Sequence, residues 1–382
     1  MPRRSAKTRV FLSEVKEPME LIKEFADIFA KVKTDIRLTE EDGIRLIKSK
    51  NIRELGTMAN FVKRRLHGNK VHFTHSINVN HSNICVLSCK FCAFAKTKKD
   101  KDAYALTVDE IERRVKVAAS HGVWEVHIVG GLDPDLKLAY YEEMLRRIKK
   151  SCPGVLIQAF TAVELDFYAR LEKIDVKEVI ERLITAGLGG VPGGGAEIFS
   201  ERARALICAP KISATRWLEI HKLVHQAGLR SNATMLYGHV ETPEERVDHM
   251  MRLRETQDES GGFLAFVPLA FQPDNTELSH LPRTGGLTDL QVLATSRLML
   301  DNFSHIRQLW NYVDEKLIHV ALEYGVDDLG GTNFDETIAK AAGSQSKGFT
   351  YKEIVNLIQA CHGEPIEVNS TYTEINKECL VA

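Results

Sequence analysis

The sequence predicts an α/β fold, a (β/α)8-type barrel preceded by an N-terminal helical extension, and three observations favour it. Residues 14–66 repeat apolar positions at intervals of three and four, as amphipathic helices do. From residue 73 onward, eight short β-rich runs alternate with helical stretches, which implies parallel strands joined by crossover helices. Polar and glycine-rich segments directly follow these runs, as they do at the carboxyl ends of barrel strands.

The helical extension is expected to occupy residues 1–70, and the barrel residues 71–382, where a C-terminal helix and a polar tail complete the same domain. Thr39, followed by two glutamates and an aspartate, predicts a helix N-cap with an acidic first turn. No internal repeat or obvious linker divides the rest of the chain.

The eight expected strands are continuously apolar rather than alternating, which suits strands buried on both faces. They cover residues 73–80, 124–131, 155–163, 187–193, 230–238, 263–271, 306–313 and 325–331. Helix starts between them fit the capping-box pattern at Thr107, Thr242 and Thr288, and Pro243 stands at a preferred first helical position. A doubly wound open sheet is the alternative to the barrel.

The composition limits the classes of protein to consider. The chain has 382 residues, 44% hydrophobic and 27% charged, with a formal net charge of −1. A nucleic-acid partner would leave a basic excess, and a membrane span would need an apolar run of about 18 residues. The basic start is not followed by the apolar segment of a signal peptide. We therefore expect a cytoplasmic protein, with no nucleic acid or membrane as partner, whose cysteines are reduced.

Three of the seven cysteines form a constellation, Cys85, Cys89 and Cys92, with the spacing C-x3-C-x2-C. One interpretation is a zinc site completed by His75 or His81, although structural zinc sites usually combine two close cysteine pairs. The other is a four-iron cluster held by three thiolates, with its fourth iron open to an exogenous ligand. The remaining cysteines are scattered and are interpreted as small hydrophobic residues: Cys152, Cys208, Cys361 and Cys379.

The cysteine spacing, with Phe91 directly before Cys92, resembles the signature of radical S-adenosylmethionine (SAM) enzymes. Its place after the first expected strand of a β/α series strengthens the resemblance. In that superfamily three cysteines bind a [4Fe-4S] cluster, and the amino and carboxylate groups of SAM fill the open iron site. The resemblance implies a radical SAM barrel in which the three cysteines are the metal ligands and Phe91 and Phe94 bind the cofactor.

Two strand ends supply further expected contacts with SAM. Gly130 and Gly131 end the second run, where they make either a tight turn or, as the resemblance implies, a close approach to the methionine end of SAM. Glu164 ends the third run and is expected either to hydrogen-bond ribose hydroxyls or to cap the next helix.

A run of three glycines opens directly into a helical pattern, residues 196–207. The amides of Gly193, Gly194 and Gly195 are therefore expected to meet an anion or the adenosine moiety, with a flexible turn as the alternative.

Substrate-binding candidates also follow the expected strands. They are Asn78 and Asn80 after the first, Tyr237 and His239 after the fifth, Gln272 after the sixth, and Arg202 and Arg204 beyond the glycine run. An arginine suits a substrate carboxylate, although either could be surface charge. His239 is the tentative catalytic residue, because histidine exchanges protons near neutral pH, and a structural histidine is the alternative.

Beyond the cysteines, residues 70–375 resemble the radical enzymes of the futalosine route to menaquinone and their relatives that build the deazaflavin chromophore of coenzyme F420. The likeness is carried by "CKFCAF", "PGGGAEI", "QDESGGF", "FQPDNT" and "RLMLDNF". The stretches "NATMLYGHVET" and "FVPLAFQPDNT" look most like the aminodeoxyfutalosine synthase branch, with the cyclic dehypoxanthine futalosine synthase branch as the alternative. Lys340 stands where relatives are expected to carry histidine.

The resemblance implies a transferase of menaquinone biosynthesis. A 5′-deoxyadenosyl radical from SAM would add to the double bond of 3-[(1-carboxyvinyl)oxy]benzoate and give 6-amino-6-deoxyfutalosine. The protein would position the radical carbon and exclude water. An electron donor such as flavodoxin or ferredoxin is implied as a partner. With zinc at the cysteines, the chain would instead be a non-catalytic metal-binding module.

Overall fold

The computed structural model describes residues 22–313, 315–332, 337–344 and 348–375. The basic start, the first helical residues expected from position 14, and Cys379 lie outside these ranges.

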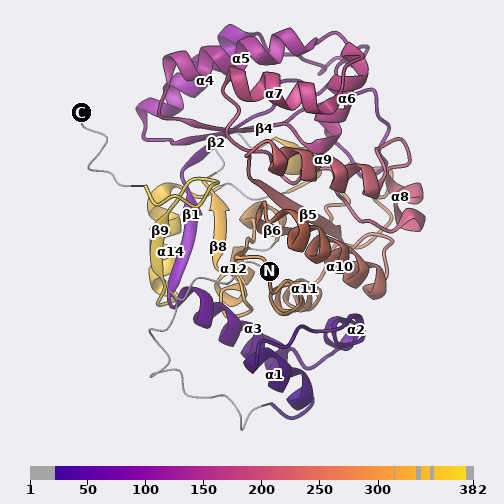
Figure 1. Ribbon diagram of the computed structural model, residues 1–382, viewed down its shortest axis with the longest axis vertical. Coiled ribbons are helices and arrows are strands. Elements are labelled where there is room, and N and C mark those ends of the chain that lie inside the picture. The colour runs from indigo at the N-terminus through magenta and orange to yellow at the C-terminus, as the bar shows by residue number, and fades with distance from the viewer. Residues whose placement is uncertain (1–21, 314, 333–336, 345–347, 376–382) are drawn as a thin grey trace.

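Three helices precede the first strand and pack on the outer helical layer (Figure 1). They are α1 (Ala26–Lys33), α2 (Glu40–Lys48) and α3 (Ile52–His67). Thr39 caps α2 as predicted, because its side chain accepts from the Asp42 amide and the Asp42 side chain accepts from the Thr39 amide. α2 and α3 contact α11 (Gly286–Met299), and Leu46, Leu55 and Met58 are completely buried in the shared core.

All paired strands are parallel, which confirms the α/β class. They form three three-stranded sheets. The first is β2 (Ser76–Val79), β3 (Glu125–Ile128) and β4 (Leu156–Ala159); the second is β5 (Ser231–Tyr237), β6 (Phe263–Ala270) and β7 (His305–Ile306); the third is β8 (Asp328–Gly331), β1 (Lys70–Thr74) and β9 (Glu364–Glu367). Isolated parallel bridges link neighbouring sheets at Gln158–Gly190, Val191–Ser231 and Arg307–Asp328.

Helices surround the strands on the outside (Figure 1). After β2 they are α4 (Val108–Ser120), α5 (Leu138–Ser151), α6 (Ala162–Glu172), α7 (Val176–Ala186), α8 (Glu201–Ile207), α9 (Ala214–Gln226) and α10 (Pro243–Ser260). Beyond α11 follow the 3-10 turn η2 (Trp310–Tyr312), α12 (Glu315–Ala321), α13 (Ile338–Ala341, which contains Lys340) and α14 (Tyr351–Ala360). Thr107 and Thr242 cap α4 and α10 as predicted, and Pro243 begins α10.

Four local expectations are corrected. Residues 187–193 pair only through isolated bridges, because glycines and Pro192 weaken regular strand pairing. The strand expected at 306–313 ends after Ile306 and continues into η2. α11 begins at Gly286, so Thr288 lies inside the helix and is not its cap. The polar tail contains an unexpected strand, β9, which pairs with β1.

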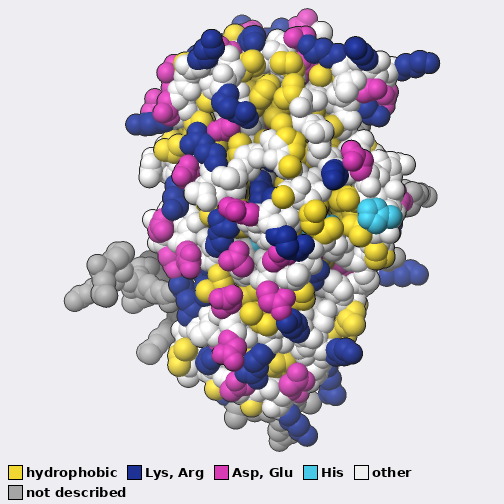
Figure 2. Space-filling view, turned by 90° about the vertical axis from the view of Figure 1, so that its right-hand side faces the viewer, with side chains coloured by type: hydrophobic (Ala, Val, Ile, Leu, Met, Phe, Trp, Pro, Cys, Tyr) yellow, Lys and Arg dark blue, Asp and Glu magenta, His cyan; other side chains and the backbone are white. Residues whose placement is uncertain are grey.

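The exterior carries charges of both signs. On the face shown in Figure 2, Lys and Arg side chains are interspersed with Asp and Glu side chains. Exposed ion pairs of the described chain include Arg45 with Asp27 at 2.6 Å and Arg283 with Asp274 at 2.6 Å. Among the described residues, no helix combines the length and the apolarity that crossing a bilayer requires.

Candidate active site

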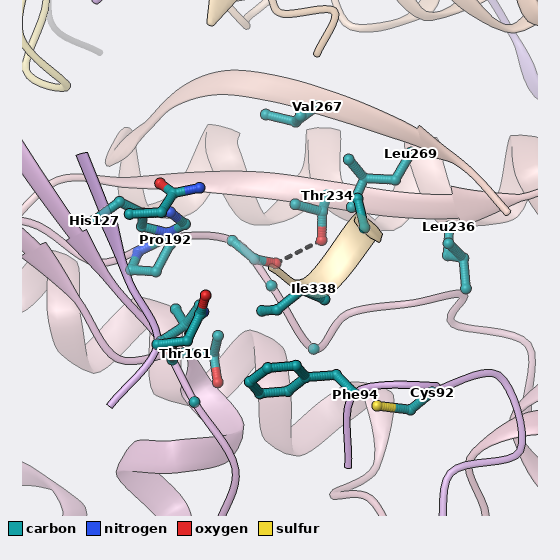
Figure 3. Close-up of a pocket in the computed structure, with 18 of the residues that line it drawn as sticks. Cys92, Phe94, His127, Thr161, Pro192, Thr234, Leu236, Val267, Leu269 and Ile338 are labelled. Atoms are coloured by element: carbon teal, nitrogen blue, oxygen red, sulfur yellow. Dashed lines mark hydrogen bonds between the residues drawn. The ribbon is translucent and has the colours of Figure 1, made fainter. Parts of the chain in front are cut away.

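A cavity of about 350 Å³ lies among the strands, and all three clustered cysteines line it. Alternate residues of the strands face it, because side chains of a strand point to opposite faces in turn. β5 contributes Asn232, Thr234 and Leu236, and β6 contributes Val267 and Leu269. In Figure 3, Cys92 and Phe94 lie at one end of the cavity and His127 lies at the other. We call these the cysteine end and the deep end.

The cysteine loop is held by backbone hydrogen bonds to three other segments. The amide of Cys85 donates to Lys96 O at 3.0 Å, that of Val86 to Leu132 O at 3.1 Å, and that of Lys90 to Ile207 O at 2.8 Å. The three thiols are free and half-buried. Burial raises the pKa of Cys89 to about 12 and also raises the pKa of Cys92, so both are protonated thiols until a metal displaces the proton.

Gly130 and Gly131 are needed because the cysteine loop approaches them closely. A Cβ at Gly131 would lie 2.1 Å from Ile84 O, and one at Gly130 would lie 2.5 Å from the His81 ring. The Gly131 amide donates to Ser82 O at 2.7 Å. These glycines therefore hold the cysteine loop against the end of β3, and both also line the cavity.

Glu164 is buried, lines the cavity and caps α6 as well. Its carboxylate accepts from the Gly130 amide at 3.1 Å and from the amide and hydroxyl of Thr161 at 2.7 and 2.8 Å. Burial raises the pKa of this carboxyl to about 7. The capping role is confirmed, and the carboxyl sits between the two glycine-rich segments.

The glycine run fits closely against β5. A Cβ at Gly193 would lie 2.4 Å from Asn232 O, and Gly195 has a φ of +86°. The helix expected from residue 196 begins only at Glu201, with Ser200 as its cap, because Glu197 has a φ of +50° and interrupts the turn. All three glycines line the cavity, but their amides do not lie at a helix N-terminus.

A buried ion pair beside the cysteines was not anticipated from the sequence. Lys211 binds the Glu197 carboxylate, and its ammonium lies 5.0 Å from the Phe91 ring centroid. Burial alone lowers the pKa of Lys211, but the Glu197 carboxylate raises it overall, so the side chain is a cation. Nothing in the local sequence of Lys211 marks it, since the pair joins segments that meet only in the fold.

The deep end carries polar groups with unused hydrogen-bonding capacity. Arg307 lines it and donates from Nε to Asp328 at 2.9 Å and from Nη2 to the Tyr372 hydroxyl at 3.2 Å. Five buried polar atoms of lining residues have no hydrogen-bond partner within the described part of the chain: Thr74 Oγ1, Asn78 Oδ1, His127 Nε2, Asn232 Oδ1 and Asn311 Oδ1. A charged or imidazole side chain within an otherwise apolar strand sequence, as at His127 and Arg307, is the sequence pattern that could have predicted this polar end of the cavity.

Three predicted substrate-binding amides line the cavity. Asn78 lines the cavity, and its side-chain oxygen Oδ1 has no hydrogen-bond partner among the described residues. The side-chain amide of Asn80 instead donates to Val129 O at 3.0 Å. Gln272 donates to Ala270 O at 3.2 Å and to Tyr312 O at 3.0 Å. Phe91 and Phe94 line the cysteine end, as predicted for cofactor contacts.

The other substrate-binding candidates do not line the cavity, and these placements are corrected. Arg202 is exposed and binds Glu245 at 2.7 Å, while Arg204 is buried and donates to Ala196 O at 2.6 Å. Tyr237 donates to Asp289 at 2.8 Å, because Leu236 points inward and its neighbour must point outward. His239 is buried against Leu236 O at 3.1 Å and Glu241 at 3.0 Å, away from the cavity lining.

The geometry does not support the zinc alternative. The His81 ring is completely buried, lies 3.4 Å from the Tyr141 hydroxyl and does not line the cavity. Thiolates on one tetrahedral zinc would lie about 3.8 Å apart, given a Zn–S distance of about 2.3 Å. Among the described residues, the grouping of ligand atoms within 4.8 Å of one another contains none of the three cysteines.

Two family models and several known proteins match the sequence of this chain. Residues 79–253 match the model of the radical SAM superfamily, and residues 260–378 match that of the CofH/MqnC C-terminal region. The chain is 44% identical to the aminodeoxyfutalosine synthase of Thermus thermophilus, over 91% of this chain and 95% of that protein. It is 36% identical to the cyclic dehypoxanthine futalosine synthase of Streptomyces coelicolor, over 89% and 86% of the two chains.

A further relative and two solved structures are also similar to this chain. The 5-amino-6-(D-ribitylamino)uracil–L-tyrosine 4-hydroxyphenyl transferase of Methanoculleus marisnigri is 39% identical over 82% of this chain and 87% of that protein. Among solved structures, the FeFe-hydrogenase maturase HydG of Carboxydothermus hydrogenoformans superposes with a TM-score of 0.73 at 17% identity, covering 91% and 80% of the two chains. Methylornithine synthase superposes with a TM-score of 0.71 at 18% identity, covering 88% and 97%.

Proposed function

The chain belongs to the radical SAM superfamily, and from that premise we propose that it is an aminodeoxyfutalosine synthase. Such an enzyme joins the 5′-deoxyadenosyl group of SAM to 3-[(1-carboxyvinyl)oxy]benzoate and forms 6-amino-6-deoxyfutalosine for menaquinone biosynthesis, with methionine leaving from SAM and the carboxyl group of the enol-ether side chain lost as carbon dioxide. The observation that carries the proposal is the 44% identity to the Thermus thermophilus enzyme over nearly the whole of both chains. The zinc-binding module is set aside, since the family consists of adenosyl-radical enzymes.

Enzymes of this family use a [4Fe-4S] cluster and SAM, and the cysteine end of the cavity suits both. We assign the cluster to Cys85, Cys89 and Cys92, because they are free thiols on one well-anchored loop and line the cavity together. When bound and reduced, the cluster supplies the electron that splits SAM into methionine and the 5′-deoxyadenosyl radical. Lys211, with Glu197, places a buried ion pair beside this charged cofactor.

The groups around the cysteine end have the chemistry that SAM requires. Gly130, Gly131 and the run Gly193, Gly194 and Gly195 allow close backbone approach, and Phe91 and Phe94 offer apolar surface. Glu164 is placed between the two glycine segments, where its carboxyl can meet a ribose hydroxyl while its other contacts fix its position. These residues would bind and orient SAM.

The strands beyond them would hold the substrate and keep water away. A carbon radical needs its partner alkene in contact and no competing hydrogen donor. Leu236, Val267 and Leu269 add apolar side chains of β5 and β6 to the cavity lining. That arrangement suits a small substrate with an unsaturated, ring-bearing middle and charged ends.

We further infer that the eight strand segments close into one (β/α)8-type barrel around this cavity, in residues 71–382, with residues 1–70 as the helical extension. Three facts support closure. Isolated parallel bridges connect the three sheets. Only His75 separates β1 from β2, and the Thr332 amide donates to Thr74 O at 3.0 Å beside it. Alternate residues of strands from all three sheets line one cavity.

The reaction also needs an electron, which we assign to a small donor such as flavodoxin or ferredoxin. An oxygen-sensitive cluster and free cysteines favour a reducing, cytoplasmic location.

The sister activity, cyclic dehypoxanthine futalosine synthesis, is the second candidate, since that relative is 36% identical over 89% of this chain. Product analysis separates the two. The protein is reconstituted anaerobically and incubated with SAM, reductant and 3-[(1-carboxyvinyl)oxy]benzoate, and the products are identified by mass spectrometry. We expect a product that contains the whole adenosyl group. Only free 5′-deoxyadenosine, with substrate unchanged, would reject the proposed function.

A further inference from the structure

The cavity has two basic side chains among its described lining residues, Lys211 and Arg307, and they lie at different ends. Lys211 is committed to Glu197 beside the cysteines. Arg307 comes from the strand series at the other end, where it is buried against Asp328 and Tyr372. Because Lys211 is occupied beside the cofactor, Arg307 is the cation left for a ligand at the deep end.

The Arg307 guanidinium has one nitrogen that donates no hydrogen bond to a described residue. Its Nε and Nη2 are used by Asp328 and Tyr372, and no hydrogen bond runs from Nη1 to a described residue. A guanidinium presents five N–H groups in a rigid fork, so one face can pair with a protein carboxylate while the other pairs with a ligand carboxylate.

Other unmet polar atoms surround the same end. His127 Nε2, Thr74 Oγ1 and Asn232 Oδ1 have no hydrogen-bond partner within the described ranges, and all three residues line the cavity. Residue burial reaches 98% at Thr74 and 96% at Asn232. A hydroxyl and an imidazole N–H are donors that suit a carboxylate. The side-chain amide of Asn232 can bind a polar substituent on the ligand's ring.

We propose that Arg307, through Nη1, binds the ring carboxylate of the substrate, with His127 and Thr74 completing the carboxylate subsite. The inference rests on the proposed function. The enol-ether carbons must reach the SAM carbon at the cysteine end, so the aromatic ring extends toward the deep end and carries its carboxylate to Arg307. Arg307 is thus a positioning and specificity residue, which selects substrates with an anionic group on the far side of the ring.

The test compares two ligands on the cluster-loaded, SAM-bound protein by calorimetry under anaerobic conditions. One is 3-[(1-carboxyvinyl)oxy]benzoate and the other is its ring carboxamide, which keeps the shape and loses the charge. The wild-type protein should prefer the carboxylate by roughly 10- to 100-fold, the range for a hydrogen bond to a charged group. Arg307→Gln should bind the two ligands within about threefold of each other, and Arg307→Lys should retain part of the preference.

Arg202→Gln is the matched control, because Arg202 is exposed and pairs with Glu245 outside the cavity lining. It should keep the full wild-type preference. If Arg307→Gln does not fold, the wild-type arm still decides, since equal affinity for carboxylate and carboxamide overturns the inference. An Arg307→Gln protein that keeps the wild-type preference also overturns it. Failure of the wild-type protein to form any adenosylated product would instead reject the proposed function.

Discussion

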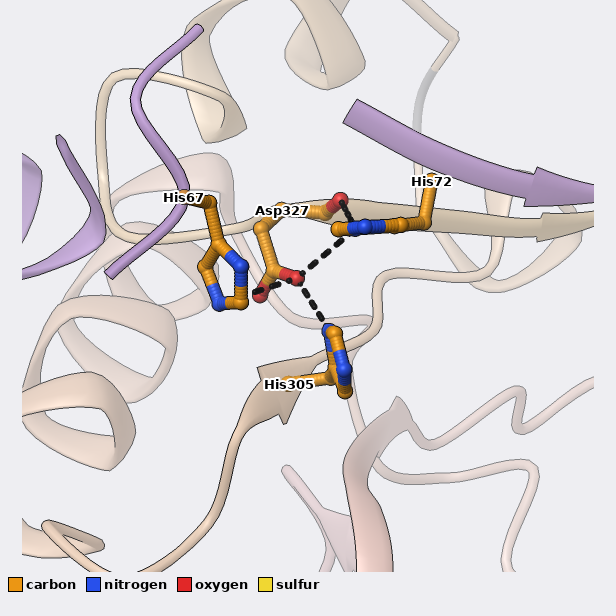
Figure 4. A group of neighbouring side chains, drawn as sticks. All are labelled: His67, His72, His305 and Asp327. Atoms are coloured by element: carbon orange, nitrogen blue, oxygen red, sulfur yellow. Dashed lines mark hydrogen bonds and ion pairs between the residues drawn. The ribbon is translucent and has the colours of Figure 1, made fainter. Parts of the chain in front are cut away.

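Two neighbouring groups of buried polar side chains differ in how completely they are hydrogen-bonded. At the amino ends lies a closed cluster, His67, His72, His305 and Asp327 (Figure 4). Asp327 Oδ1 accepts from Arg297 and from the Ile306 amide at 2.9 Å. Its Oδ2 accepts from His305 at 2.6 Å and His72 at 3.3 Å, while His67 binds Ser304 O at 2.7 Å. A carboxylate has about four lone-pair sites, and all are used.

Among the residues that line the cavity, by contrast, five buried polar atoms are unmet within the described residues. Two consecutive aspartates separate the two environments, because Asp327 serves the closed cluster and Asp328 binds Arg307 on the cavity side. Tyr372 touches both, stacking on His305 at 3.5 Å and donating its hydroxyl to Asp328. A fully satisfied network of this kind has a structural role, even when its atoms are close enough to resemble a metal site, whereas unmet atoms that line a cavity are available to a ligand.

The largest effect is expected at the cysteine end. Cys89→Ala should remove the cluster and all turnover, because three thiolates leave no spare ligand. Iron content measures whether the cluster is present, and SAM cleavage measures turnover. Replacing Cys152, Cys208, Cys361 and Cys379 together is the control and should leave the cluster in place. Full activity in Cys89→Ala would contradict the ligand assignment.

Gly131→Ala should disturb the same loop without touching a thiol. Its Cβ would lie 2.1 Å from Ile84 O, a backbone atom one residue before Cys85, so the loop must move. We expect most of the bound iron to be lost while the protein remains folded by circular dichroism. Gly154→Ala meets nothing within 4 Å and should bind iron like the wild type. Equal iron content in both variants would show that the glycine does not position the loop.

Asp327→Asn should break the closed cluster and lower the free energy of unfolding by about 3–5 kcal/mol, because it leaves the buried Arg297 guanidinium unpaired. Urea denaturation of the cluster-free protein measures this. Asp301→Asn is the matched control, since Asp301 pairs with Arg37 at the surface at 3.1 Å and should change stability by at most about 1 kcal/mol. A cost for Asp327→Asn no larger than that of the control would contradict the structural interpretation.

Glu164 should give the protein a pH dependence of stability. Burial raises its pKa from 4.5 to about 7, so the folded chain holds one more proton than the unfolded chain between these values. The free energy of unfolding should therefore fall as pH rises from about 4.5 to about 7, by roughly 3 kcal/mol at most, and stay level above that.

The measurement is the difference between wild-type and Glu164→Gln proteins in cluster-free form, since the amide cannot titrate. Their unfolding free energies should diverge across this pH window in the stated direction. Glu201→Gln, at an exposed position at the start of α8, is the control for removing a carboxylate. Parallel curves for wild type and Glu164→Gln would mean that the carboxyl is not held neutral by burial.

The sequence predicted those parts of the site that depend on residues close together in the chain. The cysteine spacing, the caps at Thr39 and Thr242 and the glycine-rich strand ends were found because each depends on neighbours in sequence. Tyr237 was misplaced because one residue of register decides whether a strand side chain points inward.

The remaining site residues depend on contacts between distant segments. Arg202 pairs with Glu245 on α10, a partner that the sequence around Arg202 does not predict. Lys211 meets Glu197, and Arg307 meets Tyr372, only in the folded chain. These pairs follow from the tertiary structure, and no local pattern encodes them.

Ligand-induced thermal stabilisation tests whether ligands bind at the cavity, where polar groups are unsatisfied, and not at the closed cluster. The melting temperature of cluster-loaded protein is measured with SAM, with and without 3-[(1-carboxyvinyl)oxy]benzoate, in the wild type, Asp327→Asn and Arg307→Gln. Binding to the folded state raises the melting temperature. We predict that Asp327→Asn melts lower but keeps the substrate-induced rise, whereas Arg307→Gln loses most of that rise. Loss of the rise in Asp327→Asn together with its retention in Arg307→Gln would contradict the account.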